Sequence, residues 1–275
     1  MIQYFNFHSI GIKIKKKLET IMQVRIIRVS EFDRITSELR EIKNRELFHS
    51  LSRVEEIDKG INKDILVRIK DSLHLSNSQN LQDLIVGAVV GGNGFFVEFG
   101  AADGIELSNT FYLEKYLNWH GLLIEPDKYW KTDLKRNRKC QLDYRAVVPS
   151  SGSRKKFAFT SDTSPLHSKL ADDGHVQVGI QRIHKVIGAS LEEILKSCNA
   201  PKKIDLISMD VEGSELAILE NFDFKAYDVR FWIVEHNFRL SDMRKIKELM
   251  FSKGYEIYLE NFSAQDFYFI SKNKW

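Results

Sequence analysis

FVEFGAADGIELSNT, residues 96–110, is the stretch that decides the fold of this 275-residue chain. It continues an apolar run that begins at Phe95, and such a run is typical of a β-strand that is buried on both faces. Gly100 follows at once and permits a sharp backbone turn close to a ligand. Asn109 and Thr110 then lead into apolar residues at helical spacing. The stretch therefore predicts a strand, a turn and a helix, whose free backbone N–H groups face the ligand crevice of an α/β sheet.

The spacing of glycines and acids in this turn narrows the class of ligand. A dinucleotide site has the pattern G-x-G-x-x-G, whereas this turn combines Gly100 and Gly104 with the acids Glu98 and Asp103. Two carboxylates repel a pyrophosphate, but they suit a ligand that carries positive charge and hydroxyl groups. S-adenosylmethionine, with its sulfonium, ammonium and ribose, is such a ligand. The turn is less typical of an NAD-dependent dehydrogenase, and a purely structural turn in another α/β protein is the remaining alternative.

Further apolar segments complete a predicted sheet. The strand GLLIEPD brings Glu125 to a position about 20 residues beyond the turn, where an acid accepts hydrogen bonds from ribose hydroxyls. The last two strands are separated by a short turn only, so they must pair antiparallel. The pattern predicts an α/β fold with a Rossmann-like, mostly parallel sheet of seven strands that ends in an antiparallel hairpin. The other predicted strands are 140–148, 203–210, 229–236, 254–260 and 265–272, and the predicted helices are 191–198 with Ser190 as N-cap, 214–222, and 241–254 between Ser241 and Gly254.

Five motifs follow one another along the chain: SQNLQDLIV (78–86), FVEFGAADGIELSNTFYLEK (96–115), GLLIEPD (121–127), IDLISMDVEGSELAILENF (204–222) and WIVEHN (232–237). Together they resemble the FkbM family of S-adenosylmethionine-dependent methyltransferases, over roughly residues 76–270. The DVEGSE and VEHN segments are the most distinctive part of this resemblance. It implies a class I methyltransferase fold, S-adenosylmethionine as the cofactor, and O-methylation of sugars or natural-product hydroxyls.

The resemblance also implies which residues bind the cofactor. A segment before the first strand folds over the cofactor in methyltransferases, so Gln79 and Gln82 are candidates for its methionine portion; polarity of a helix surface is the alternative. Asp143 is a candidate for the adenine amino group, although this chain has Tyr144 where the family often has asparagine. The predicted cofactor-binding residues are Gln79, Gln82, Glu98, Gly100, Ala101, Asp103, Asn109, Glu125, Asp143 and Asp210.

Methyl transfer to a hydroxyl needs a group that removes the proton. His236 follows the strand 229–236, at the sheet edge where ligands bind, and imidazole titrates near neutral pH. We therefore predict His236 as the base, with its pKa raised by the carboxylates at 210, 212 and 235 unless a metal cancels their charge, and Asp210 as a second catalytic residue. Asp210, Glu212 and Glu235 offer hard oxygen ligands that suit Mg²⁺. A magnesium site and direct polar contacts with cofactor and acceptor are the two alternatives for these acids.

The N-terminal part differs from the rest in charge. Residues 1–30 contain six lysines and arginines against one glutamate, a net of +5, whereas the whole chain carries +3. Such an arm can contact anionic lipid, and a solvated charge run is the alternative. Apolar residues three or four apart over 32–61 predict amphipathic helices that cover the catalytic domain or form a homo-oligomer. We predict a basic, helical extension over residues 1–62 and a methyltransferase domain over 63–275.

Composition is that of a globular enzyme, with 43% apolar and 29% charged residues. The sequence has no apolar run long enough to span a membrane and no clear signal peptide. Cys140 and Cys198 form no C-x-x-C motif, so they are expected in the core and suit a reducing cytoplasm. Nucleic-acid binding is not expected, because basic residues are few and no aromatic interleaving or zinc module is present. These features favour a cytoplasmic location, including the inner face of the membrane.

Residues 160–188 show few periodic signals and carry several histidines, aspartates and one arginine. A loop at this place is expected to select the acceptor. We predict an S-adenosylmethionine-dependent O-methyltransferase that acts on a hydroxyl of a sugar or glycan. O-methylation of a small natural product and a non-catalytic, cofactor-binding scaffold protein are the alternatives.

Overall fold

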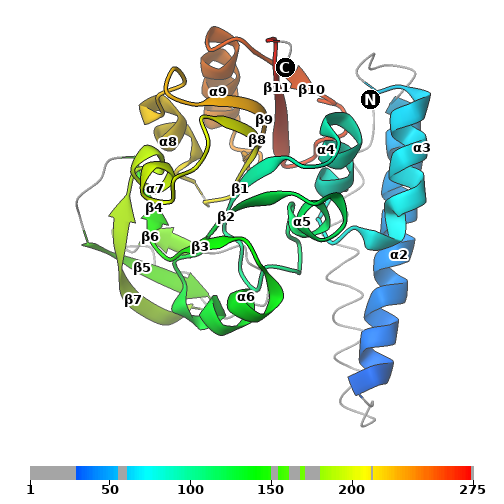
Figure 1. Ribbon diagram of the computed structural model, residues 1–275, viewed down its shortest axis with the longest axis horizontal. Coiled ribbons are helices and arrows are strands. Elements are labelled where there is room, and N and C mark those ends of the chain that lie inside the picture. Colours follow the sequence, from blue (N-terminus) through cyan, green and yellow to red (C-terminus); the bar gives the residue numbers. More distant parts are fainter. Residues whose placement is uncertain are drawn as a thin grey trace. The chain divides into compact units, whose positions relative to one another are not determined.

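A seven-stranded sheet forms the centre of the computed structural model, which describes residues 29–54, 61–149, 154–160, 168–170, 180–211 and 213–273. The strands are β1 (Phe95–Phe99), β2 (His120–Ile124), β3 (Gln141–Asp143), β8 (Lys203–Met209), β9 (Asp228–Glu235), β10 (Tyr255–Tyr258) and β11 (Asp266–Ser271). Their order across the sheet is β10-β11-β9-β8-β1-β2-β3 (Figure 1). β11 pairs antiparallel with both β9 and β10, and the remaining pairs are parallel. The predicted sheet of seven strands with a C-terminal antiparallel hairpin is confirmed.

The order of the strands creates a crevice beside β1. The chain runs outward from β1 through β2 to β3 and later returns to the other side of β1 with β8. The connections after β1 and after β8 therefore leave the sheet in opposite directions. In open α/β sheets, ligands bind at the carboxyl ends of the strands at such a reversal. The fold thus places a ligand site between the segments that follow β1 and β8.

Helices cover both faces of this sheet (Figure 1). One face packs on the second half of α2 (Val29–Val54) and on α3 (Lys63–Ser72), α4 (Gln82–Val90), α5 (Phe111–Leu117) and α6 (Lys131–Asn137). The other face packs on α7 (Leu191–Ser197), α8 (Glu215–Asn221) and α9 (Leu240–Ser252). Strand residues alternate between the two apolar cores, so Phe96 faces the first set of helices while Val97 and Phe99 face the second. Burial on both faces explains why β1 reads as a continuous apolar run.

Most predicted helix ends agree with the structure. The side chain of Ser190 accepts a hydrogen bond from the Glu193 N–H and caps α7, as predicted. The helix predicted to begin at Ser241 instead begins at Leu240, with Arg239 in the N-cap position. Its end agrees with the prediction, because Gly254 adopts a φ of +87° just after the last turn.

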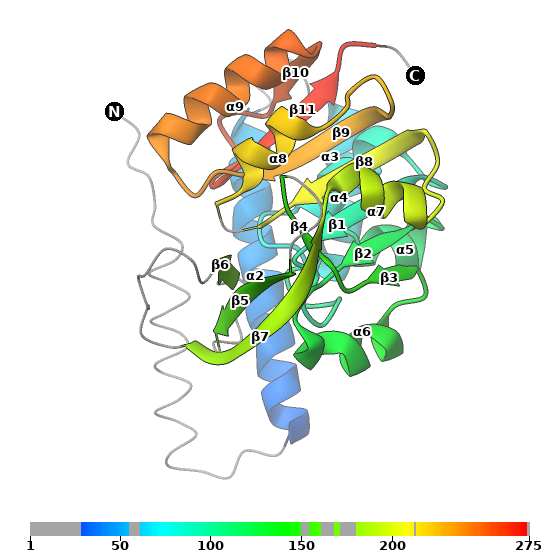
Figure 2. The same ribbon diagram turned by 90° about the vertical axis from the view of Figure 1, so that its left-hand side faces the viewer.

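The region between β3 and β8 differs from the prediction. The strand predicted over 140–148 is interrupted at Tyr144 and Arg145, and its second part, β4 (Ala146–Val147), belongs to another sheet. That sheet has the order β4-β7-β5-β6, with β5 (Arg154–Thr160), β6 (Ser168–Leu170) and the long β7 (Ile180–Ala189) (Figure 2). Much of the predicted acceptor loop 160–188 is therefore strand. Its residues His167, Asp172, Asp173 and His175 lie outside the described residues.

The chain divides into two compact units, Met1–Lys43 and Asn44–Trp275. The described part of the first unit is the beginning of α2, which confirms a helix in the N-terminal extension. Leu47 and Leu51, later in α2, are buried in the core of the second unit. The predicted domain division after residue 62 stays a prediction, and the basic arm of residues 1–28 lies outside the described residues.

No helix among the described residues is long and apolar enough to cross a membrane.

Candidate active site

A cleft opens at the carboxyl ends of β1, β8 and β9, at the predicted crevice. The space between its lining residues amounts to about 550 Å³ with the open space at its mouth included. Five acids line it, and none of its described lining residues is a lysine or an arginine. The lining consists of Gln79 and Gln82, Glu98 to Ala101, Glu106 to Asn109, Ser208 to Asp210, Ile233 and Glu235, and Gln265 and Asp266.

Gly100 brings the two sides of the crevice into contact. Its φ is +70°, and an added Cβ would lie 2.8 Å from the backbone oxygen of Asp210. Its own N–H donates to the carbonyl of Ile124 at the end of β2. Only glycine combines this backbone conformation with this close approach, so Gly100 fixes the spacing between the segments that follow β1 and β8.

Gly100→Ala should therefore destabilise the fold more than an alanine placed at an uncrowded glycine. Gly254→Ala is the matched control, since Gly254 also has a positive φ of +87° but nothing within 4 Å of its added Cβ. We expect Gly100→Ala to lower the free energy of unfolding by about 1–3 kcal/mol more than the control, the usual cost of overpacking. Urea unfolding measures both variants, and equal losses would show that the contact with Asp210 is unimportant.

Glu98 lines the cleft and also braces its wall. Its carboxylate accepts hydrogen bonds from the hydroxyls of Ser108 and Thr110 and from the N–H of Asn109 at 2.7 Å. Burial raises its pKa, and the nearby Arg138 opposes this rise. The carboxylate of Glu98 thus holds the loop that follows Gly104, and its predicted direct role in cofactor binding stays a prediction.

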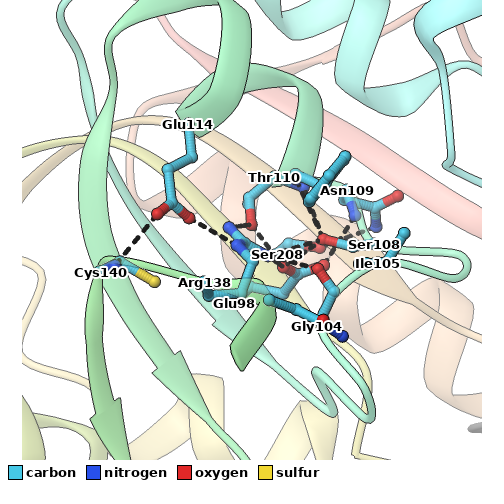
Figure 3. A network of polar contacts seen from close by, with 12 residues as sticks. Glu98, Gly104, Ile105, Ser108, Asn109, Thr110, Glu114, Arg138, Cys140 and Ser208 are labelled. Carbon is cyan, nitrogen blue, oxygen red and sulfur yellow. Dashed lines mark hydrogen bonds and ion pairs between the residues drawn. The ribbon is translucent and has the colours of Figure 1, made fainter. Parts of the chain in front are cut away.

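Arg138 joins the parts of this wall (Figure 3). It is buried, and its guanidinium donates to the carboxylate of Glu114, the carbonyl of Gly104 and the hydroxyl of Thr110. It also lies 3.8 Å from the Glu98 carboxylate. Sequence reasoning missed Arg138, because it lies in a charged run in which nothing distinguishes it from its exposed neighbours.

Asn109 presents a polar atom to the cleft. Its amide nitrogen donates to the hydroxyl of Ser208 at 2.9 Å. Its buried Oδ1 accepts no hydrogen bond from any described residue. Asn109 therefore offers a hydrogen-bond acceptor to a ligand, in agreement with its predicted place in the cofactor site.

Glu125 is buried at the end of β2 and does not line the cleft. One carboxylate oxygen accepts the N–H of Ala102 and the other accepts the N–H of Asp127. Burial raises its pKa to about 7, and the negative charges of Asp127 and Asp210 contribute to this rise. Glu125 thus braces the turn that begins at Gly100, and a contact with ribose stays a prediction.

Asp103 and Asp143 also lie outside the cleft lining. Asp103 accepts the N–H groups of Ile105 and Glu106 and so closes a local turn. Asp143 forms an ion pair with Arg145 at 2.6 Å, and hydrogen bonds from Arg145 hold its pKa below the usual value although burial alone would raise it. Their predicted contacts with the cofactor are therefore untested.

Asp266, which sequence reasoning missed, lies opposite Glu235 in the antiparallel pairing of β9 and β11. Both residues line the cleft. The Gln82 amide donates to Asp266 at 2.9 Å. Burial raises the Asp266 pKa to about 7, and the charge of Asp210 adds to this rise. The sequence shows only that Asp266 is an acid near the start of the last predicted strand. It does not show the register that pairs this strand with β9 and brings Asp266 opposite Glu235.

Asp210 and Glu235 come together with a third acid, Glu215. Their carboxylate oxygens lie within 4.8 Å of one another. Asp210 and Glu235 were predicted as metal ligands together with Glu212, which lies outside the described residues. Glu215 is the first residue of α8. The structure thus assembles an acid cluster at the predicted place, with Glu215 as an additional member.

The side chain of Glu235 lines the cleft, but that of the next residue, His236, does not. Its buried ring lies 4.2 Å from that of Phe267 between centroids and does not line the cleft. Nδ1 accepts the N–H of Phe238 at 3.1 Å, so the neutral ring carries its proton on Nε2 and has no lone pair left for a hydroxyl. The geometry does not support His236 as the base, and that role stays a prediction.

The predicted rise of the His236 pKa is wrong. Burial lowers this pKa to about 4, and the positive charges of Lys247 and Arg239 add to the effect. The prediction assumed that carboxylates at the strand ends face the ring. Instead, the ring turns into the apolar layer beside Phe267, where the loss of hydration outweighs them.

One family model matches more than half of the chain. The model of the family described as "Methyltransferase FkbM domain" matches residues 98–257, which is 160 of the 275 residues. No curated protein matches the sequence. Among solved structures, a methyltransferase FkbM from Methylobacillus flagellatus KT is 11% identical with a TM-score of 0.42, and the alignment covers 83% of this chain and 58% of that one.

Fibrillarin from Aeropyrum pernix, solved with natively bound S-adenosyl-L-methionine, is 14% identical with a TM-score of 0.36, and the alignment covers 69% of this chain and 71% of that one. This chain therefore spans more than two thirds of the fibrillarin but less than two thirds of the Methylobacillus protein. Both structural likenesses are too distant to carry an argument about activity. The family match is different, because it covers more than half of the chain and includes the cleft-lining residues between Glu98 and Glu235. The protein belongs to the FkbM methyltransferase family.

Proposed function

We propose that the protein is an S-adenosylmethionine-dependent O-methyltransferase whose acceptor is a hydroxyl of a sugar or glycan. The observation that carries this proposal is the charge of the cleft, which is lined by five acids and, among the described residues, by no basic side chain. An acidic cleft attracts a cationic ligand such as a sulfonium with an ammonium group, and it repels the pyrophosphate of a dinucleotide. The family match supports the same reading.

The residues of the cleft fit S-adenosylmethionine. Gly100 and Ala101 line the cleft at the end of β1, and the orphaned Oδ1 of Asn109 can accept a hydrogen bond from a ligand ammonium. Gln79, from the segment predicted to cover the cofactor, lines the same space. These residues would bind and orient the cofactor. Once bound, S-adenosylmethionine supplies an electrophilic methyl group.

The carboxylates and amides that line the cleft favour a sugar or glycan as the acceptor. Carboxylates and amides hydrogen-bond to several hydroxyls of one ligand, which suits a sugar better than an apolar natural product. Removal of the hydroxyl proton is assigned to a cleft carboxylate, with Asp210 and Asp266 as the candidates. A carboxylate with a pKa near 7 is well matched to this task at neutral pH.

A methyl-transfer screen tests the proposal. The full-length protein would be incubated with S-adenosylmethionine that carries a labelled methyl group and with free sugars, nucleotide sugars, oligosaccharides and phenolic small molecules. Transfer to a carbohydrate hydroxyl is the expected result. Transfer to phenolic compounds alone would favour the natural-product alternative, and cofactor binding without any transfer would favour a scaffold.

A further inference from the structure

The acid cluster of Asp210, Glu215 and Glu235 resembles a site for a divalent cation, because three carboxylate oxygens converge within 4.8 Å. The hydrogen bonds of Glu215 argue against such a site. Its Oε1 accepts the N–H groups of Val211 at 3.2 Å and Gly213 at 3.0 Å. This oxygen of Glu215 is therefore already engaged by the protein itself.

The second oxygen of Glu215 is engaged by a cation that belongs to the chain. The guanidinium of Arg239, from the loop after β9, donates to Oε2 at 2.8 Å. The Glu215 side chain is only 2% exposed, so this ion pair is shielded on the acid's side. A guanidinium at this distance places a full positive charge at the cluster and repels a second cation.

Gly213 shows that the loop is built to admit this guanidinium. An added Cβ at Gly213 would lie 2.2 Å from a terminal nitrogen of Arg239, and the φ of Gly213 is +118°. The glycine of the DVEGSE motif thus leaves space for Arg239, while the last glutamate of the motif binds it. Gly213 and Glu215 of this motif therefore both contribute to the contact with Arg239.

We propose that the guanidinium of Arg239 supplies the positive charge of the acid cluster in place of a divalent metal. The enzyme accordingly works without a metal. Arg239 is a positioning residue: through Glu215 it holds the loop that follows Asp210, and Asp210 and Glu235 line the cleft. The expected effect of Arg239 on turnover rests on the proposed methyl transfer. The expected effect of Arg239 on metal binding is independent of that function.

The proposal makes a prediction about the cluster without Arg239. In Arg239→Ala the three carboxylates remain, but their counter-charge is lost, so the cluster should become a site for a divalent cation. Arg239→Lys keeps a positive charge and should exclude the cation. Arg244→Ala is the matched control, because Arg244 lies five residues later in α9, is exposed and forms a 4.0 Å pair with Glu248.

Mn²⁺ binding to the full-length proteins, measured by titration calorimetry and by electron paramagnetic resonance, tests this directly. We expect one Mn²⁺ to bind Arg239→Ala at least about tenfold more tightly than wild type, Arg239→Lys or Arg244→Ala. A wild-type protein that binds one Mn²⁺, with the binding lost in Asp210→Asn, would overturn the proposal. Equal and weak binding in wild type and Arg239→Ala would overturn it as well.

Turnover provides the second readout. EDTA should leave the wild-type rate unchanged, and Arg239→Ala should lose about 100-fold in turnover, the usual result of a small misplacement in an active site. Arg239→Lys should recover part of this loss. A wild-type rate that EDTA abolishes and Mg²⁺ restores would contradict the inference. If no acceptor is methylated at all, the proposed function fails, and the Mn²⁺ titration still decides the role of Arg239.

Discussion

Replacing Arg138 with alanine should lower the free energy of unfolding by about 3–5 kcal/mol, the usual cost of removing one partner from a buried ionic network. The guanidinium is buried and satisfies Glu114, Gly104 and Thr110, with Glu98 nearby (Figure 3). Without it, the carboxylate of Glu98 keeps its hydrogen bonds but loses the nearest positive charge. The wall formed by residues 106–109 should loosen, so binding in the cleft should weaken as well.

Arg136→Ala is the matched control for this prediction. Arg136 lies two residues earlier, is exposed, and pairs with Asp133 on the surface of α6. Exposed pairs of this kind contribute about 0–1 kcal/mol. Chemical unfolding of wild type and both variants measures the difference. A loss in Arg138→Ala no larger than that in Arg136→Ala would show that the network does not hold the wall.

Asp266→Asn should reduce turnover roughly 10²–10⁴-fold if Asp266 accepts the proton of the acceptor hydroxyl. Asparagine keeps the shape of the side chain and can still accept the hydrogen bond from Gln82, but it cannot take a proton. The wild-type rate should rise with pH through about 7, where Asp266 ionises. A variant that keeps this rise and most of the turnover would leave Asp210 as the better candidate.

Asp266→Asn should lower turnover but raise the free energy of unfolding at alkaline pH. The folded-state pKa of Asp266, about 7, lies above its ordinary value of 3.8. Its contribution to stability is therefore fully present below about pH 4 and is lost as the pH rises through 7. At pH 8 Asp266→Asn should be more stable than wild type, by an amount on the order of a few kcal/mol, because it avoids a buried charge. At pH 4 this advantage should disappear, as thermal unfolding at both pH values would show.

Apolar patterning made the central sheet predictable. The central strands β1, β2, β8 and β9 are buried on both faces, so their apolar runs are long and end at turn residues. The same reasoning failed between β3 and β8. Asp143 and Arg145 form an ion pair at the point where the chain leaves one sheet for the other, and no periodic signal marks that exit. The strands of the second sheet alternate polar and apolar residues too weakly to distinguish them from a loop.

The candidate site was predictable at the ends of β1, β8 and β9. Gly100, Asp210 and Glu235 line the cleft there, because the ends of parallel strands meet at one edge, whereas Glu125 at the end of β2 lies outside the lining. Asp266 was missed since its place depends on the register of an antiparallel pair. His236 shows a further limit of the sequence.

The prediction for His236 used its place at a strand end and did not use the alternation of side chains along β9. Glu235 turns to the cleft, whereas His236 turns into the apolar layer around Phe267. The pairing of Arg239 with Glu215 was unpredictable, because it joins two loops whose approach only the folded sheet defines.

The most direct test of the central claim, an acidic cleft that binds a cationic nucleoside cofactor, is titration calorimetry of the full-length protein. S-adenosylmethionine, S-adenosylhomocysteine and NAD would be compared under the same conditions of pH and salt. We predict one site for S-adenosylmethionine and for S-adenosylhomocysteine, and no measurable binding of NAD. Binding of NAD without binding of S-adenosylmethionine would contradict the account.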